Sequence, residues 1–123
     1  MKKTNMEAAE LLPLTPAAFQ ILLALAEGEC HGYAIMQEVE RGGEGKRRMG
    51  PGTLYGSIKR LLSDGLIEES TERPSARLDD ERRRYYRLTK FGRQVMVAEA
   101  ERLENLVNEA RAKSVLRNPK LAT

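Results

Sequence analysis

The sequence predicts a single domain that is mostly helical, carries one small β-hairpin and ends in a long helix. Three observations point to this fold class: apolar residues recur at helical spacing in three early segments, the spacing changes to strand-like alternation after residue 65, and a long apolar stripe follows residue 89. The length of 123 residues is that of one ordinary domain. An enzyme with separate cofactor and substrate lobes is therefore not expected.

The first third of the chain predicts a lead-in piece followed by two short helices. Residues 6–12 form an amphipathic piece that ends before a proline. Thr15 is placed to cap the next helix, which opens with Pro16 and ends at Gly28. A second helix is expected over residues 32–40, where apolar side chains recur every three residues.

A turn rich in glycine and basic residues separates these two helices from a third. Residues 41–50 hold four glycines and four bases without helix or strand periodicity, and they lack the spacing of a nucleotide-binding phosphate loop. Pro51 opens the third helix and Gly65 closes it. Its buried face is predicted to consist of Leu54, Ile58, Leu61 and Leu62, and its polar face of Thr53, Ser57, Arg60 and Asp64, with Lys59 at the flank.

The remaining residues predict a hairpin and a long last helix. The two strands are expected over residues 66–73 and 82–88, with a polar tip between them. Thr89 is placed to cap a helix that runs to about residue 113 and is roughly 36 Å long. Since the small preceding core is too short to cover this helix, part of its apolar stripe is expected to meet a second subunit, through Val95, Met96, Leu103, Leu106, Val107 and Ala110.

The charges are segregated along the chain although the net charge is only +3. Residues 41–60 carry six bases and one acid, and residues 73–93 carry eight bases and three acids, so each stretch has a charge of +5 and the remainder has −7. If the fold brings the two basic stretches together, one surface attracts an anionic partner such as DNA. The alternative is that both stretches are solvated surface without a partner.

Three helices, a hairpin and a long helix follow one another in the order of a winged helix-turn-helix that is extended by a dimerisation helix. The chain is thus divided into a DNA-binding domain over residues 11–89, a dimerisation helix over residues 90–113 and a frayed tail over residues 114–123. In such a fold the third helix enters the major groove of DNA.

The DNA contacts are expected to come from the third helix and from the hairpin. Thr53 and Ser57 have short hydroxyl side chains that can approach base edges. Lys59 and Arg60 are expected to contact phosphates, and the ring of Tyr55 to pack while its hydroxyl either reaches a phosphate or stays in the core. The hairpin is expected to follow the DNA backbone or enter the minor groove through Arg77, Arg82 and Arg83. Acids at residues 79–81 are alternative ion-pair partners for these arginines.

Five motifs in this order resemble the PadR family of bacterial transcriptional regulators. They are Leu14-Thr15-Pro16; His31-Gly32-Tyr33; Pro51-Gly52-Thr53-Leu54-Tyr55; Lys59-Arg60-Leu61 with Gly65-Leu66-Ile67; and Tyr85-Tyr86-Arg87-Leu88-Thr89 followed by Gly92-Arg93. The resemblance covers residues 11–93. It implies a dimeric winged-helix repressor that binds a palindromic operator, is often released by a small molecule, and exchanges contacts between subunits through its last helix.

The chain departs from the family pattern at two points. Gly50 stands where many relatives have a serine, which removes a side-chain cap and any phosphate contact by that hydroxyl. Tryptophan is absent, so an aromatic drug-stacking site of the kind known in some relatives is not carried over.

No group of residues predicts catalysis, a metal or a cofactor. Cys30 and His31 are the only cysteine and histidine, so a zinc site or an internal disulfide is excluded, and no nucleophile is paired with a base. Cys30 is expected to pack, with a redox-sensing thiol as the minor alternative, and His31 to cap or pack at the start of the second helix. No apolar run spans a membrane and no secretory signal is evident, so a cytoplasmic protein is expected.

The predicted function is a DNA-binding transcriptional regulator, most simply a repressor, that acts as a homodimer. The alternative is a winged-helix protein-interaction module whose basic face binds an acidic partner without direct DNA binding. A small enzyme has the least support.

Overall fold

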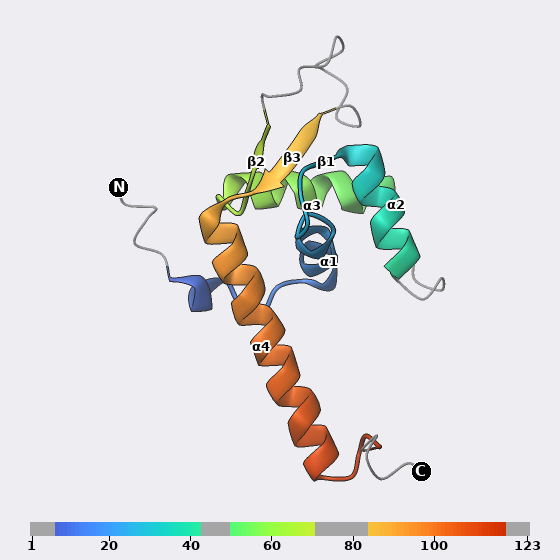
Figure 1. The fold of residues 1–123 in the computed structure, drawn as a ribbon, viewed down its shortest axis with the longest axis vertical. Coiled ribbons are helices and arrows are strands. Elements are labelled where there is room, and N and C mark those ends of the chain that lie inside the picture. Colours follow the sequence, from blue (N-terminus) through green and yellow to red (C-terminus); the bar gives the residue numbers. More distant parts are fainter. Residues whose placement is uncertain (1–6, 43–49, 71–83, 118–123) are drawn as a thin grey trace.

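The structure is a computed structural model that describes residues 7–42, 50–70 and 84–117 of the chain (Figure 1). Along the chain its elements are η2 (Ala8–Leu11), α1 (Pro16–Ala24), β1 (Cys30–His31), α2 (Gly32–Gly42), α3 (Pro51–Ser63), β2 (Ile67–Glu69), β3 (Tyr85–Leu88) and α4 (Lys90–Ala112). The mostly helical fold class is confirmed, and the amphipathic lead-in piece is a four-residue 3-10 helix. Within the described ranges no helix has the length and apolarity needed to cross a membrane.

The sheet has three antiparallel strands in the order β1-β3-β2, one more than the predicted hairpin. Cys30 pairs with Tyr86 and His31 with Tyr85, so β3 lies in the centre of the sheet. The prediction missed β1 because a strand of two residues has no periodicity to detect. The other two strands are shorter than expected within the described residues, and the expected hairpin positions 71–83 lie outside those residues.

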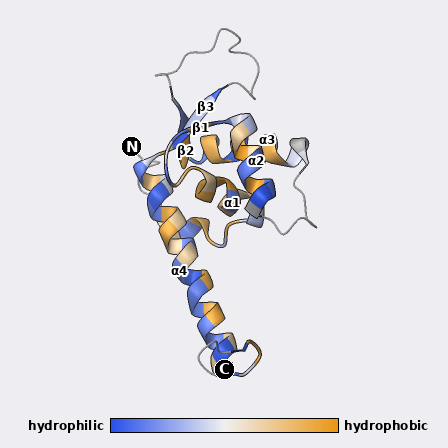
Figure 2. Cartoon of the chain, turned by 45° about the vertical axis from the view of Figure 1, so that its right-hand side comes forward, coloured by the Kyte–Doolittle hydropathy of each residue, from blue (hydrophilic) through white to orange (hydrophobic). Residues whose placement is uncertain are grey.

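The core forms where α1, α2, α3 and the upper part of α4 meet the sheet. The predicted buried face of α3 is confirmed for Leu54, Ile58 and Leu61, which are at most 2% exposed. Figure 2 shows α1 as almost entirely hydrophobic, whereas hydrophobic and hydrophilic residues alternate along α4. The uniform apolarity of α1 suits a helix that has neighbours on several sides.

Side-chain caps start three of the helices where the sequence predicts them. The Oγ1 of Thr15 accepts a hydrogen bond from the Ala18 N–H at 3.0 Å, and the Oγ1 of Thr89 accepts one from the Gly92 N–H at 2.8 Å. The Nδ1 of His31 accepts a hydrogen bond from the Ala34 N–H at 3.1 Å. This bond confirms the capping role expected for His31 at the start of α2.

The start of α4 is docked onto the residues that follow α3. The Thr89 N–H and hydroxyl both donate to the Leu66 carbonyl at 3.1 Å, and the hydroxyl also lies 2.6 Å from the Gly65 carbonyl. Gly92 is buried against the same Leu66 carbonyl, and a Cβ on Gly92 would lie only 1.8 Å from that oxygen. Only glycine therefore fits at position 92.

The middle of α4 is tied to the N-terminal segment through a buried carboxylate. Glu99 is 2% exposed and accepts two hydrogen bonds from the Arg102 guanidinium, at 2.7 and 2.9 Å. These bonds lower the pKa of Glu99 against the opposing effect of burial, and a hydrogen bond from the Leu14 backbone lowers it further. The carboxylate thereby holds the chain before α1 against α4.

The upper part of α4 packs within the chain to a greater extent than expected. Val95 and Met96, which the sequence suggested for a subunit interface, are 0% and 7% exposed and belong to the chain's own core. The docking of Gly92 brings this part of the helix directly onto the core, so the two side chains retain little surface for a second subunit.

Replacing Gly92→Ala is expected to destabilise the protein because the new methyl group meets a backbone oxygen that cannot move independently. We expect a loss of at least about 2 kcal/mol in the free energy of unfolding, measured by urea denaturation. The matched control is Gly56→Ala, where a Cβ has no heavy atom within 4 Å. That variant should gain about 0.4–1 kcal/mol. Equal stabilities of the two variants would contradict the close-packing argument.

Replacing Glu99→Gln is expected to cost about 1–2 kcal/mol at pH 7, because it removes a charge-assisted pair of hydrogen bonds. The pKa of Glu99 is lowered on folding, so its stabilising effect is complete above the ordinary glutamate pKa and is lost as the pH falls through the folded-state value. The difference between the wild type and the variant, measured by urea denaturation, should therefore shrink below about pH 4. A difference that is constant from pH 7 to pH 3 would disprove this role.

Candidate nucleic-acid interface

The polar residues predicted for α3 lie on the side of the helix that faces away from the core. Thr53, Lys59 and Arg60 are exposed, and Ser57 is half-buried. Tyr55 is also half-buried, and its side chain packs against the core cluster. The structure therefore brings Thr53, Ser57 and Arg60 onto one outward face of a helix whose other face is anchored by leucine and isoleucine.

The amino-terminal turn of α3 is slim and uncapped. At Gly50, Gly52 and Gly56 a Cβ would have no heavy atom within 4 Å, so this part of the helix presents backbone to its surroundings. Gly50 makes no side-chain capping bond, as expected from the missing serine. The first N–H groups of a helix have no partner inside the helix, and they form a partial positive charge that suits a phosphate.

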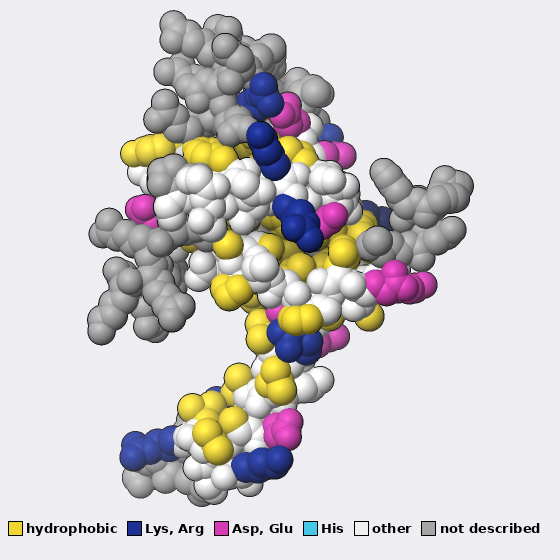
Figure 3. Space-filling model, turned by 180° about the vertical axis from the view of Figure 1, so that it is seen from behind, with side chains coloured by type: hydrophobic (Ala, Val, Ile, Leu, Met, Phe, Trp, Pro, Cys, Tyr) yellow, Lys and Arg dark blue, Asp and Glu magenta, His cyan; other side chains and the backbone are white. Residues whose placement is uncertain are grey.

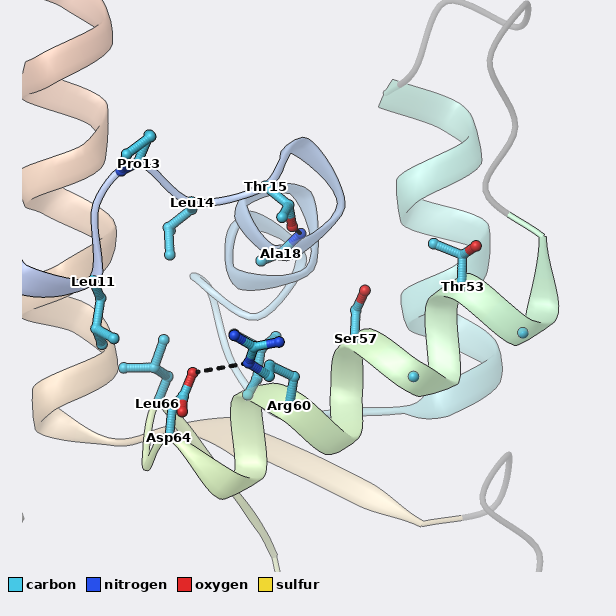
Figure 4. Close-up of a pocket in the computed structure, with 13 residues that line it drawn as sticks. Leu11, Pro13, Leu14, Thr15, Ala18, Thr53, Ser57, Arg60, Asp64 and Leu66 are labelled. Carbon is cyan, nitrogen blue, oxygen red and sulfur yellow. Dashed lines mark hydrogen bonds and ion pairs between the residues drawn. The ribbon is translucent and has the colours of Figure 1, made fainter.

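The outward face of α3 is one wall of a hollow of about 400 Å³ (Figure 4). The opposite wall is the segment that leads into α1, with Leu11, Leu14, Thr15 and Ala18. In Figure 4, the Ser57 and Arg60 side chains extend from α3 into the space beside Thr15 and Ala18. Sequence reasoning missed this second wall because it assigned Thr15 only to capping.

Two cations on α3 remain accessible to an anionic partner. The Arg60 side chain is 81% exposed, and its Nε lies 3.7 Å from Asp64 in a long ion pair. Such an exposed pair contributes about 0–1 kcal/mol, so it yields readily to a phosphate. Lys59 is exposed and makes no ion pair within the part of the chain that the structure describes.

Three arginines in or near the sheet make ion pairs or hydrogen bonds within the chain. Arg87 of β3 pairs with Glu68 of β2 at 2.9 Å, and Arg84, which precedes β3, pairs with Glu69 of β2 at 3.0 Å. Arg93 donates to the Ala26 carbonyl at 3.0 Å. Seen from behind in Figure 3, Lys and Arg side chains lie one above another over the middle of the body, most of them beside an Asp or Glu.

These pairs reduce the free positive charge that the sequence assigned to the second basic stretch. The hairpin residues predicted to contact DNA lie outside the described residues: Arg77, Arg82 and Arg83. The acids at residues 79–81, which offer those arginines an alternative, lie outside as well.

The described residues contain no cluster of three potential metal ligands. Burial raises the pKa of the Cys30 thiol, and nearby Glu38 and Glu29 add to this effect. The thiol also lies 3.7 Å from the Ala24 carbonyl, as a donor. A thiol that is held in its protonated form is a poor nucleophile, which favours the packing role expected for Cys30.

The sequence is similar to known regulators over most of its length. Residues 21–98 match the model of the transcriptional regulator PadR-like family. The chain is 39% identical over 89 residues to the transcriptional regulator Rv3488 of Mycobacterium tuberculosis, a match that covers 72% of this chain and 77% of that protein. It is also 36% identical over 90 residues to an uncharacterized 37.1 kDa protein in transposon TN4556 of Streptomyces fradiae, where it covers 73% of this chain and only 24% of the longer protein.

Solved structures give the same result. A transcriptional regulator from Clostridium thermocellum superposes with a TM-score of 0.66 at 27% identity, covering 81% of this chain and 90% of that chain. A PadR family transcription regulator from hypervirulent Clostridium difficile superposes with a TM-score of 0.64 at 25% identity. The match covers 83% of this chain and 100% of that chain. The three helices, the small sheet and the long last helix are thus a winged-helix architecture. The chain belongs to the PadR-like family, whose members are transcriptional regulators and not enzymes.

Proposed function

We propose that this protein is a DNA-binding transcriptional repressor that acts as a homodimer on a palindromic operator and is released by a small-molecule effector. The observation that carries the proposal is the outward face of α3. It is polar, slim at its amino-terminal turn and flanked by exposed Lys59 and Arg60, while the opposite face is fixed in the core. A helix with these properties fits the major groove of DNA.

The residues of α3 have different roles in this proposal. Thr53 and Ser57 face the base edges, because their short side chains allow close approach of the helix. Lys59 and Arg60 contact phosphates and set the register. Tyr55 packs against the core cluster and holds the orientation of the helix. The hairpin adds backbone or minor-groove contacts through Arg77, Arg82 and Arg83.

The hollow beside α3 supports a wider contact with the duplex. With α3 in the major groove, the neighbouring phosphate strand passes along the segment before α1, which forms the other wall. Thr15 is exposed there at the positive end of α1. The two walls of the hollow contact the phosphate strand on both sides, which fixes the angle at which α3 approaches the duplex.

The lower half of α4 supports the dimer. Leu106 and Val107 are 50% and 38% exposed, and Leu103 and Ala110 are half-buried beside them. An exposed apolar stripe of this kind on a projecting helix is typical of a subunit interface. In the proposed dimer the two α3 helices enter successive major grooves, about 34 Å apart.

The first test is the salt dependence of binding to the promoter next to the protein's own gene. If six to ten phosphates are contacted per dimer, the affinity should fall by roughly 10³–10⁵ between about 50 and 200 mM salt. Lys59→Ala and Arg60→Ala should each reduce the salt slope by about 2, one unit per copy, with Lys113→Ala at the end of α4 as the control. Binding that is equally tight at both salt concentrations, or absent at both, contradicts the proposal. If the protein captures an acidic protein but does not bind DNA, the result favours the alternative function, a winged-helix protein-interaction module.

The second test separates base reading from phosphate binding. Ser57→Ala and Thr53→Ala should relax the preference at one or two base pairs in each half-site, by about 1–3 kcal/mol, while the salt slope stays unchanged. The measurement is a competition assay against operator duplexes that are substituted one base pair at a time. Loss of affinity that is uniform across all duplexes would show that these hydroxyls do not read sequence.

A further inference from the structure

The hollow beside α3 has an apolar part that a phosphate strand does not use. Its lining contains six residues with apolar side chains: Leu11, Pro13, Leu14, Ala18, Leu61 and Leu66. A phosphate group brings negative charge and hydrogen-bond acceptors, but it has no apolar surface that gains from contact with leucine. The proposed contact with DNA therefore accounts for only the polar part of the hollow.

The apolar and the polar residues lie toward opposite ends of the hollow (Figure 4). In this view Leu11, Leu14 and Leu66 are gathered toward one end. Ser57 lies toward the other end, and the Arg60 side chain extends into the space between the two ends. A ligand that fills this space has an apolar body at one end and a polar or charged group at the other.

The polar end favours a carboxylate. Arg60 is the one cation among the described residues that line the hollow. Its Nε forms the long contact of 3.7 Å with Asp64, and within the described residues no ion pair occupies its two terminal nitrogens. A guanidinium binds a carboxylate through two parallel hydrogen bonds, so these nitrogens are suited to one. The Thr15 oxygen accepts a hydrogen bond from the Ala18 N–H, and its own O–H can donate to the ligand.

The size of the hollow is that of a small-molecule site. Such sites occupy about 300–1,000 Å³, and the hollow, at about 400 Å³, lies near the lower end of this range. Gly52 and Gly56 line it without side chains, and a Cβ at either position would have no heavy atom within 4 Å. The α3 wall thus leaves the space open, and the space suits a molecule with a short chain or a single ring.

We propose that the hollow between α3 and the segment before α1 binds a small organic carboxylate that carries an apolar body. The carboxylate lies on Arg60 and Ser57, and the body packs against the leucines at the other end. This inference rests on the proposed function, and it assigns the site and the chemical class of the effector. A bound carboxylate occupies the surface that faces the phosphate strand and neutralises Arg60, so the ligand and DNA exclude each other.

The first test measures the binding of octanoate to the DNA-free protein by titration calorimetry, with amide chemical shifts to locate the site. Octanoate should bind with a dissociation constant in the millimolar range or lower and shift the amides of Thr15, Gly56 and Ser57. Octanol lacks the charge and inorganic phosphate lacks the apolar body, so each should bind at least about tenfold more weakly. The inference is overturned if octanoate does not bind, or if either control binds as tightly.

Two neighbouring cations on α3 separate a built site from general attraction of anions. Arg60→Ala should weaken octanoate binding at least about tenfold, and Arg60→Lys, which keeps the charge but loses the paired hydrogen bonds, should give an intermediate value. Lys59 is exposed but does not line the hollow, so Lys59→Ala should weaken DNA binding and leave octanoate binding unchanged. Equal losses of octanoate binding in Lys59→Ala and Arg60→Ala overturn the inference. Thermal unfolding of each variant verifies that the fold is retained.

The second test adds the promoter DNA. The apparent dissociation constant for DNA should rise with the octanoate concentration once the hollow is filled, because each protein molecule binds one or the other. An affinity for DNA that stays the same when octanoate is bound overturns the inference. If octanoate binds in the hollow as expected but no DNA binds, the site is supported and the proposed function is rejected. DNA binding by a protein that does not bind octanoate supports the proposed function and rejects the site.

Discussion

The close approach of Gly92 to the Leu66 carbonyl is the constraint on which the arrangement of the molecule depends. Leu66 lies just beyond the end of α3, after Asp64 and Gly65, and Gly92 lies in the first turn of α4, so their contact fixes one helix relative to the other. Thr89 reinforces the junction with hydrogen bonds to the same carbonyl. A side chain at position 92 would separate the helices, and the position of the outward face of α3 relative to the lower half of α4 would change with it.

Much of the fold follows from local rules that are visible in the sequence. The caps at Thr15 and Thr89 and the buried stripe of α3 are determined by residues a few positions apart, so patterns reveal them. Strand β1 was missed because two residues carry no period, and its pairing with β3 is a long-range contact. The cross-strand ion pairs of Arg84 and Arg87 were missed for the same reason, since the register of a sheet is absent from a linear reading. The burial of Val95 and Met96 in the chain's own core was not foreseen, because their apolar stripe is continuous and a sequence does not show where the core that covers it ends.

Charge divides the surface according to the proposed roles. The α1–α2 side is acidic and the α3 side carries the accessible cations Lys59 and Arg60. The acidic side repels the phosphates that the α3 side attracts, so a duplex has one favoured orientation on the protein. This division explains why a net charge of only +3 is compatible with the binding of a polyanion.

The described part of the sheet has edges that are poor templates for further strands. At one edge β1 has two residues, and at the other β2 has three, of which two are glutamates. Short and charged edges resist the backbone pairing that leads to aggregation. The protein can thus expose a small sheet without forming open-ended polymers through it.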